Sequence, residues 1–567
     1  MKKIQIPASE GSFLMVTALL TYVLSVWLFP ATLHNTEAEG FFACVPDFIG
    51  SSLHQPAGAG HVATAFLIQF FRWPWAGAAL LTGLHLLCAG ASLSLLRRNR
   101  SFPLGAIYTL FIYIALAVFQ FAVLWAAWTA AVVQTFAALY AATSRRWMRQ
   151  ALLLLVPAGY LLVAEPALLL LGAELLFMEV FLFRCRTNGI LAAVVWLLSA
   201  ALPALWSTQV AFVPPAVRYT GGATDTLPAW LYIALAIPVA GLALHRRKPY
   251  HRPTRMLQWL GLAIAVAAPL LLLTNEEQRK QEQFFALEQA AEAADWEQVL
   301  RLTEGSDFNA DPMSLRYALL AESGRGTLPE RWLSYPITQP EQFLFRHIFT
   351  PKTCLFNALF YKNLQQPDEA FHQAFEGGVL SPQGRSMRSI RQQTDAALEA
   401  GERQLARQYM ALLERTATHS RWLSERYDRL QRLPVQPQQT DSIPARSRNF
   451  AGALPLDAEW VNALEHDPSN RKLLDYLLCT FLLQKRPEKF ARLMELNPQY
   501  AGQPLPAPYA QALALFADSR PQWKEKFLIP METVQEWRRC LHLQQEGRMD
   551  ELARQCAGTY WYYLFFR

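Results

Sequence analysis

The chain has 567 residues, of which 52% are hydrophobic and only 17% are charged. A soluble globular protein carries about 25% charged residues, so this composition excludes an ordinary soluble protein for a large part of the chain. The net charge of +7 does not predict a nucleic-acid partner, because Lys and Arg in the first half stand between apolar runs, where they act as topology signals.

The first half contains about nine apolar segments that could cross a membrane, and a spanning helix needs about 20 such residues. Pro157, Glu165 and Pro166 predict that the fifth and sixth form a tight, partly re-entrant hairpin. The segments lie at 12–31, 75–96, 104–123, 125–143, 151–165, 166–183, 188–206, 229–244 and 255–274.

The basic residues between these segments predict the orientation of the chain. Nine spans place every basic cluster on the side of the N-terminus, which the positive-inside rule identifies as cytoplasmic. An odd number of spans puts the second half on the other side. We therefore expect a bacterial inner-membrane protein with a cytoplasmic N-terminus and a periplasmic C-terminal domain.

The fold class expected is all-α. A polytopic transmembrane helix bundle at 1–274, with a long first outer loop at 32–74, is followed by a tetratricopeptide-like α-solenoid. The helical repeats are expected at 275–433 and 456–567, with a Pro- and Gln-rich linker at 434–455. The aromatic tail of the second part, GTYWYYLFFR, is expected to pack against the last repeat. Helical hairpins are predicted at 290–302 with 313–323, and at 357–375, 397–413 and 473–494.

The first outer loop holds the best candidates for chemistry, because Glu37, Glu39 and Asp47 follow the first span directly. Carboxylates at a membrane interface can serve as a general base or bind a divalent metal, although acids in a wet loop are more often simply solvated. A second outer loop at 208–228, which contains Arg218, could cover a site beside the first.

Ionisable residues inside the predicted spans are further candidates, because a charge is costly within a bilayer. Glu179 can reach toward Arg184 at the cytoplasmic edge, which favours a structural role. Glu174 has no such neighbour in the sequence. A transporter would need it, with His85 or Gln134 as partner.

The run PAGAGHVATAFLIQFFRWPWAGAALL resembles an uncharacterised family of multi-pass membrane proteins common in Bacteroidota, many with repeat-like C-terminal halves. In that family a Glu near Glu37, an Asp near Asp47 and a Pro-Gly-Gly-like turn near 56–58 recur in this order. Here the turn reads Pro-Ala-Gly, which costs backbone freedom.

A more distant resemblance is to the C-type membrane glycosyltransferases, which have an acidic residue in a long first outer loop. This resemblance implies that Glu37 is a catalytic base or metal ligand, with Asp47 as a helper. It also implies that His61 or Arg72 contacts the diphosphate of a lipid-linked sugar. The adjacent acidic pair of several such families is absent, since Ala38 separates Glu37 from Glu39.

No cofactor is evident, and a divalent cation is expected only for a transferase. The seven cysteines form no CxxC pair or zinc spacing. Cys540 and Cys556 could pair in an oxidising compartment, but reduced thiols are the simpler expectation. The leading hypothesis is an envelope scaffold that recruits a periplasmic protein through its repeats. The alternatives are a glycosyltransferase using a lipid-linked sugar, and a transporter.

Overall fold

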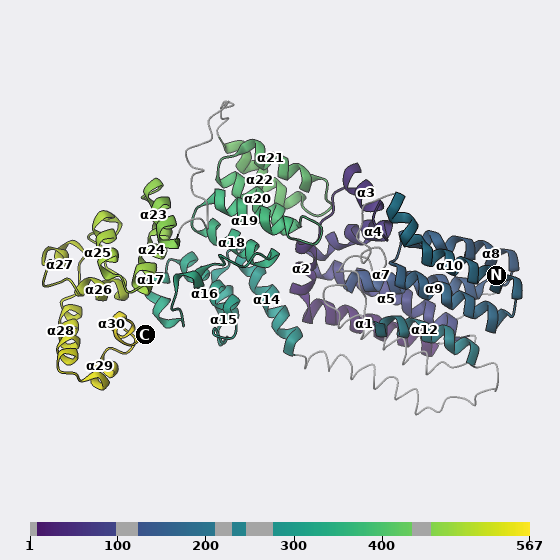
Figure 1. Ribbon diagram of the computed structural model, residues 1–567, viewed down its shortest axis with the longest axis horizontal. Helices are drawn as coiled ribbons and strands as arrows, with labels where there is room; N and C mark the ends of the chain where they lie inside the picture. Colours follow the sequence, from purple (N-terminus) through teal and green to yellow (C-terminus); the bar gives the residue numbers. More distant parts are fainter. Residues whose placement is uncertain (1–7, 98–122, 210–228, 245–275, 434–454) are drawn as a thin grey trace. The chain divides into compact units, whose positions relative to one another are not determined.

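The computed structural model describes residues 8–97, 123–209, 229–244, 276–433 and 455–567, which are helical throughout apart from connecting loops (Figure 1). The chain divides into two compact units. The first unit holds residues 1–285 together with 412–421, and the second holds 286–411 and 422–567. The chain thus leaves the second unit and enters the first one again around the connection between helices α21 (Arg403–Glu414) and α22 (Ser420–Arg432).

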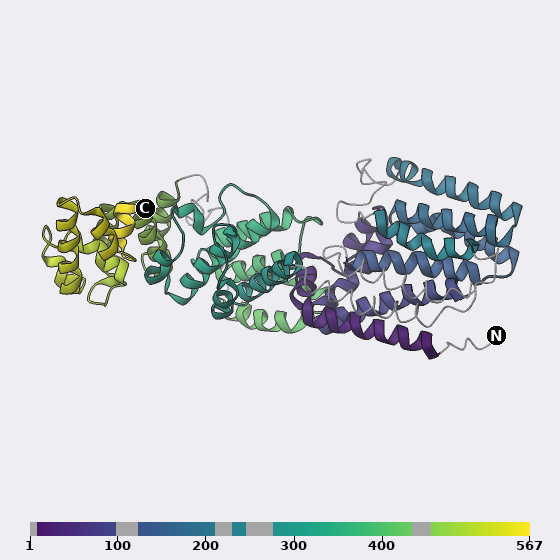
Figure 2. The ribbon, with the colours of Figure 1, turned by 90° about the horizontal axis from the view of Figure 1, so that it is seen from below.

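The described helices of the first unit run nearly parallel, and both views show α5, α7, α9 and α10 side by side (Figures 1 and 2). The elements are α1 Ala8–Leu28, α2 Pro30–Glu39, α3 Pro46–Leu53, α4 Gly58–Ile68, η1 Gln69–Arg72, α5 Pro74–Arg97, α7 Val123–Ala142, α8 Arg146–Leu155, η2 Val156–Leu161, α9 Glu165–Phe177, η3 Met178–Phe183, α10 Arg186–Gln209 and α12 Ala229–Leu244.

Four described helices are long and apolar enough to cross a membrane, rather than the nine spans expected. They cover Pro74–Leu95, Leu124–Ala142, Glu165–Phe183 and Arg186–Ala204, and two shorter apolar helices cover Ala18–Leu28 and Leu231–Ala240. The predicted spans at 104–123 and 255–274 lie almost wholly outside the described residues. The chain is thus a helical protein with four candidate membrane spans in its described part.

The predicted span at 151–165 is a composite of the short helix α8 and the 3-10 segment η2, because Pro157 interrupts the helix. Its two ends lie at different levels of the bundle. Near the start of α8, Arg149 contacts Glu179 on η3, whereas the carbonyl of Tyr160 accepts a hydrogen bond from the Ala57 amide of the first loop at 3.0 Å. This segment and α9 therefore form the hairpin that the prolines predict.

A buried polar cluster centred on Glu179 of η3 joins this element to α7, α8 and α10. One oxygen of Glu179 accepts from Tyr140 Oη at 2.6 Å on α7, from Arg149 Nε at 2.7 Å on α8 and from Asn188 Nδ2 at 3.4 Å on α10. The guanidinium of Arg149 also stacks 3.9 Å from the Phe183 ring centre. The structural role expected for Glu179 is consistent with this geometry, but its partner is Arg149 and not Arg184.

The turn Pro56–Gly60 lets the first loop approach the bundle closely. A Cβ on Gly60 would lie 2.2 Å from the Leu162 carbonyl oxygen, and one on Gly58 would lie 2.3 Å from the Ser52 carbonyl oxygen. Ala57 itself is in the left-handed region, at φ 55°, where glycine would be unstrained. The two glycines are therefore required by close backbone contact.

We expect Gly60→Ala to lower the stability of the protein by about 1–3 kcal/mol, because its new methyl group meets rigid backbone. Gly90→Ala on α5 is the matched control, since nothing lies within 4 Å of its Cβ position. That change should be neutral or should stabilise the helix by up to about 1 kcal/mol. Thermal unfolding in detergent measures both, and equal effects of the two substitutions would refute the close contact.

The second unit is an array of short helices, most of which pack against the next helix along the chain (Figure 1). They are α14 Glu276–Glu292, α15 Trp296–Thr303, α16 Pro312–Arg325, α17 Leu328–Arg331, η5 Trp332–Ser334, η6 Pro340–Phe343, α18 Pro351–Asn363, α19 Pro367–Val379, α20 Met387–Glu399, α21 Arg403–Glu414, α22 Ser420–Arg432, α23 Leu456–His466, α24 Arg471–Leu483, α25 Pro487–Leu496, η8 Pro498–Tyr500, α26 Ala507–Ala514, α27 Gln522–Lys526, α28 Met531–Gln545, α29 Met549–Gln555 and α30 Tyr560–Phe566.

Seven helix connections in the described part of this array close in the same way. In each, one residue with positive φ follows the helix, and the next residue donates its amide to the carbonyl five positions earlier, as in a Schellman turn. The first four such turns are spaced by roughly 35 residues, close to the length of a tetratricopeptide repeat. The positive-φ residues are Ala294, Gly326, Gln365, Gly401, Lys485, Leu528 and Gly547.

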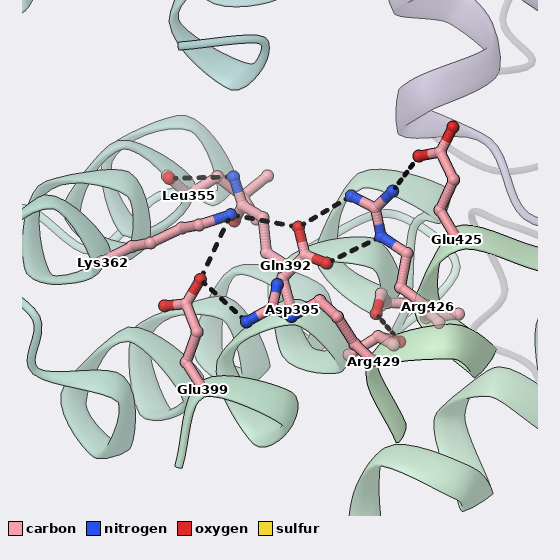
Figure 3. A network of polar contacts seen from close by, with 10 residues as sticks. Leu355, Lys362, Gln392, Asp395, Glu399, Glu425, Arg426 and Arg429 are labelled. Carbon is pink, nitrogen blue, oxygen red and sulfur yellow. Dashed lines mark hydrogen bonds and ion pairs between the residues drawn. The ribbon is translucent and has the colours of Figure 1, made fainter. Parts of the chain in front are cut away.

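Ion pairs cross-link the alternate helices α18, α20 and α22 of the array (Figure 3). Asp395 on α20 accepts from Lys362 on α18 at 3.0 Å and from Arg426 on α22 at 3.0 Å. Burial alone would raise the pKa of Asp395, but the two cations outweigh burial and hold this pKa below its usual range. Glu399 extends the network, since it lies 3.9 Å from Lys362 and 4.0 Å from Arg429.

The C-terminal residues are packed into the array, as predicted for the aromatic tail. Trp561 on α30 is buried and donates its Nε1 hydrogen to the Gln511 carbonyl at 2.9 Å, and Tyr563 Oη donates to the Leu483 carbonyl at 2.9 Å. A disulfide joins Cys540 on α28 to Cys556 just after α29, where the simpler expectation was reduced thiols. The predicted linker at 434–455 lies outside the described residues except for Pro455.

Candidate functional site

The first loop, residues 32–74, contacts the segment Leu412–Arg421, which we call the return segment because it belongs to the first unit. The Cys44 amide donates to the Arg415 carbonyl at 2.9 Å. The Ala417 amide donates to Oε1 of Gln69 at 2.8 Å, and Gln69 is itself buried at the end of α4. Backbone groups of the return segment are thus satisfied by the loop that the sequence singled out.

Glu37, the foremost predicted catalytic acid, is buried against His419 of the return segment. Its Oε1 atom lies 3.3 Å from Nε2 of His419, and both side chains are 0% exposed. A carboxylate removed from water in this way is tolerated only with a partner of matching charge or hydrogen-bonding character. The pair is therefore enclosed within the first unit and has no exposed face.

The imidazole of His419 also contacts hydroxyl groups of the return segment. Oγ1 of Thr416 donates its proton to the Leu413 carbonyl at 2.7 Å, so it accepts from Nδ1 of His419, which lies 3.0 Å away. Oγ1 of Thr418 lies 3.3 Å from the same Nδ1. These contacts orient the ring so that Nε2 faces the carboxyl group of Glu37.

Glu282 on α14 secures the beginning of the loop by capping helix α2. Its two carboxylate oxygens accept from the Ala31 amide at 2.6 Å, the Thr32 amide at 2.9 Å and Thr32 Oγ1 at 2.6 Å. Phe29 at the N-cap position has no side chain that could do this. Burial raises the pKa of Glu282, while these three hydrogen bonds lower it.

The other predicted loop residues have different surroundings. Asp47 is exposed in the first turn of α3, and Glu39 is the half-buried last residue of α2. The His61 ring stacks on Trp125 at 4.4 Å and 7° between planes, and Arg72 ends η1. Arg218 lies outside the described residues.

No cluster of three or more His, Cys, Asp or Glu side chains suited to a metal occurs within the ranges that the structure describes. The predicted divalent cation therefore has no preformed ligand set there. Glu37 lies beside His419. One imidazole and one carboxylate provide fewer ligands than the usual tetrahedral or octahedral metal site needs.

An open groove of about 520 Å³ lies in the second unit, between α15, α16 and the segment that follows α17. Its walls include the aromatic rings of Phe308 and Tyr335, whose centres are 5.5 Å apart. Glu322 in the wall is buried and accepts from Tyr335 Oη at 2.8 Å. The charged residues at the rim are Glu297, Arg301, Glu304, Arg325 and Arg331.

The groove combines cationic and aromatic side chains. Arg301, Arg325 and Arg331 each present an exposed guanidinium group, a group that can bind a carboxylate by two hydrogen bonds. The rings of Phe308 and Tyr335 provide an apolar surface beside them. Burial and the neighbouring Glu322 raise the pKa of Tyr335, so its hydroxyl remains a donor to Glu322 at any physiological pH.

A family model matches residues 4–567 of the sequence. The chain belongs to a family of unknown function, DUF6057. This match covers both units, so the membrane part and the helical array are features of one family. It supports the expected membership of an uncharacterised family. No curated protein and no solved structure matches the chain.

The sequence does not predict the residues that bind the polar groups of the first loop. His419, Gln69 and Glu282 belong to no motif, and His419 lies 382 positions after Glu37 in the chain. Only the local composition around His419 could have indicated its role. A lone His in the sequence THSRW, between two amphipathic helices, is a common surface pattern and does not single out a buried partner.

We expect His419→Ala to destabilise the return segment by about 3 kcal/mol, because the substitution leaves the Glu37 carboxylate buried without its partner. Amide hydrogen exchange should then rise in residues 412–421. The double variant Glu37→Gln/His419→Gln should cost less than the sum of its two single changes, since neither side chain is then charged. Asp47→Asn is the matched control and should change neither exchange nor stability, as Asp47 is exposed. Unchanged exchange in His419→Ala would contradict a structural role for the pair.

Proposed function

We propose that this protein is a membrane-anchored scaffold whose helical array recruits a partner protein on the outer side of a bacterial inner membrane. The observation that carries the proposal is the burial of Glu37 against His419. The acid that a transferase would present to its substrate is used to hold the return segment. The first loop then serves as a structural platform, and the open groove lies in the array.

The form of the array supports partner recruitment. Its recurring turns at a spacing of about 35 residues are those expected of a tetratricopeptide-like solenoid. Stacked helical hairpins of that kind present extended surfaces for binding other proteins. The groove beside Phe308 and Tyr335 is open to solvent, and it carries more arginines than acids at its rim. We infer that its ligand is an extended, acidic peptide segment with at least one apolar side chain.

The proposed compartment follows from charge and covalent chemistry. Basic residues between the apolar segments favour a cytoplasmic N-terminus, which places residues 276–567 in the periplasm. The Cys540–Cys556 disulfide in the array supports this orientation, because disulfides persist in oxidising compartments such as the periplasm. We propose an inner-membrane location on these two grounds.

A glycosyltransferase remains the alternative from the sequence resemblance, with Glu37 as base and Asp47, His61 and Arg72 near a lipid-linked sugar. It would require Glu37 to face its substrate, which the enclosed contact with His419 does not favour. Glu37→Gln distinguishes the two functions. Loss of an envelope glycan at normal protein abundance and normal exchange of residues 412–421 would favour the transferase over the scaffold.

The groove predicts the binding of an acidic peptide by the full-length protein in detergent. We expect the double variant Arg301→Glu/Arg331→Glu to weaken this binding at least 10-fold, because a charged hydrogen bond contributes about 1.5–3 kcal/mol. The probe is a fluorescent peptide with alternating Glu and Leu residues, read by anisotropy. Arg492→Glu, on an exposed position of α25, is the matched control and should bind as the unchanged protein does. Equal affinity in the groove variant and in the control would refute the groove as the binding site.

The orientation predicts a pattern of cysteine labelling in intact spheroplasts. Cys44, exposed in the first loop, should react with a membrane-impermeant maleimide, whereas Cys185, at the start of α10, should react only after lysis. Cys540 and Cys556 should react only after reduction, from the outside. Cys44→Ser and Cys185→Ser assign the signals. Labelling of Cys185 and protection of Cys44 in intact spheroplasts would reverse the orientation.

A further inference from the structure

Three glutamates lie on one membrane-spanning segment, and their surroundings differ. Glu165 is the first residue of the span, and its buried carboxyl oxygens have no hydrogen-bond partner among the described residues. Glu179 has one oxygen bonded to Tyr140, Arg149 and Asn188, as described above. Glu174, five positions earlier, is 4% exposed, and both of its carboxyl oxygens are enclosed without a hydrogen-bond partner in the part of the chain that the structure describes. Buried polar groups in proteins are nearly always hydrogen-bonded, so this exception requires an explanation.

Glu174 lies in the middle of the span. The span runs over Glu165–Phe183, which places Glu174 nine residues from each end. At about 1.5 Å per residue, the carboxyl group is roughly 13 Å from either end of the helix. A charge is most costly at this depth, and ionisable residues kept there usually have a functional role.

Among the described residues, the neighbouring helices offer Glu174 no counter-charge. The helix packs against α7, α10, α12 and η2. None of the titratable side chains described on these elements and on the adjoining α8 and α5 forms a described hydrogen bond or ion pair with Glu174. They are Tyr140 on α7, Arg186 on α10, Tyr232 on α12, Tyr160 on η2, Arg146 and Arg149 on α8, and His85 and Cys88 on α5. Within the part of the chain that the structure describes, Glu174 is therefore not the buried half of an ion pair.

Other polar atoms accompany Glu174 inside the bundle. The hydroxyl oxygens of Thr82 on α5, Thr129 on α7 and Ser199 on α10 are also buried without a hydrogen-bond partner among the described residues. By contrast, Gln134 on α7 bonds Ser92 at 3.2 Å and donates to the Leu235 carbonyl at 2.7 Å, beside the helix-interrupting Pro238. The interior thus contains polar groups beyond those used to fasten helices together.

The backbone next to Glu174 is also irregular. The helix changes to a π-helix at Met178–Phe183 and ends at Arg184, whose φ is 54°. π-Helical turns are rare and occur frequently at functional sites. Glu174 therefore lies about one turn before an irregular segment of the same span.

We propose that Glu174 is a proton-binding site at the centre of the membrane bundle, which takes up a proton as the carboxylic acid and returns it to water. In uptake, a carboxylate oxygen forms an O–H bond with a proton from hydronium, and water is released. The reverse step returns the proton and restores the carboxylate. This activity is independent of the scaffold function, and it gives the many-helix membrane part a role that a simple anchor would not need.

The test is modification of the full-length protein in lipid nanodiscs by dicyclohexylcarbodiimide, a reagent of the membrane interior that reacts with protonated carboxyl groups. The acid transfers its proton to a reagent nitrogen, and its oxygen bonds the central carbon. Migration of the acyl group to nitrogen then gives a stable adduct with no leaving group. Peptide mass spectrometry should locate the adduct on Glu174, and labelling should fall several-fold as the pH is raised from 6 to 9.

A second measurement covers the case in which the reagent cannot reach the site. The infrared carbonyl band of a protonated Glu174 is obtained by subtracting the spectrum of Glu174→Gln from that of the unchanged protein. This band should shift in heavy water and weaken as the pH rises. Glu174→Gln should fold normally, because its amide resembles the neutral acid in size, and Glu39→Gln should retain the band.

Three results would overturn the proposal. One is a carbonyl band that is unchanged by heavy water and by pH, which would show a permanently protonated structural acid. Another is the absence of any such band in the difference spectrum. The third is protection from labelling by sodium or lithium ions at constant pH, which would identify a metal-cation site in place of a proton site.

Discussion

The structure depends on one constraint, which is that polar groups taken out of water must find partners within the protein. One oxygen of Glu179 meets this constraint by accepting hydrogen bonds from Arg149, Tyr140 and Asn188. These contacts require α7, α8, α10 and η3, which continues α9, to converge at one point. A short segment such as α8 with η2 would otherwise have little to fix its depth, since it is only partly α-helical. The contact near the start of α8 and the Ala57–Tyr160 bond near the end of η2 together determine how this segment crosses the unit.

The same constraint explains why distant parts of the chain complete the first loop. A loop of short helices leaves many helix ends and extended backbone groups without partners. Glu282 caps α2, Gln69 accepts from Ala417, and His419 contacts the buried Glu37. Each of these partners is far from the first loop in the sequence or lies at its far end, so the loop is completed only when the chain returns to the first unit.

The sequence predicts those features that depend on local pattern. Apolar length identifies the span at 166–183 and its neighbours, and hairpins such as 357–375 and 473–494 contain the turns at Gln365 and Lys485. Pairings across hundreds of residues cannot be predicted in this way, because nothing in the residues around Glu37 specifies His419. At 151–165 the position of Pro157 predicts an interruption, whereas apolar length alone does not predict the change from α8 to the 3-10 segment η2.

The difference between Glu174 and Glu179 bears on what kind of anchor this is. Both acids are equally visible in the sequence, and both lie on one helix within a few residues of each other. A bundle built only for attachment would be more stable with an apolar residue at position 174, since replacing a buried, unpartnered polar group by a hydrophobic one of similar size removes its desolvation cost. Glu179 shows that this fold can supply partners where an acid serves packing. The lack of a described partner for Glu174 is therefore better explained by a role that needs its carboxyl group uncommitted than by chance.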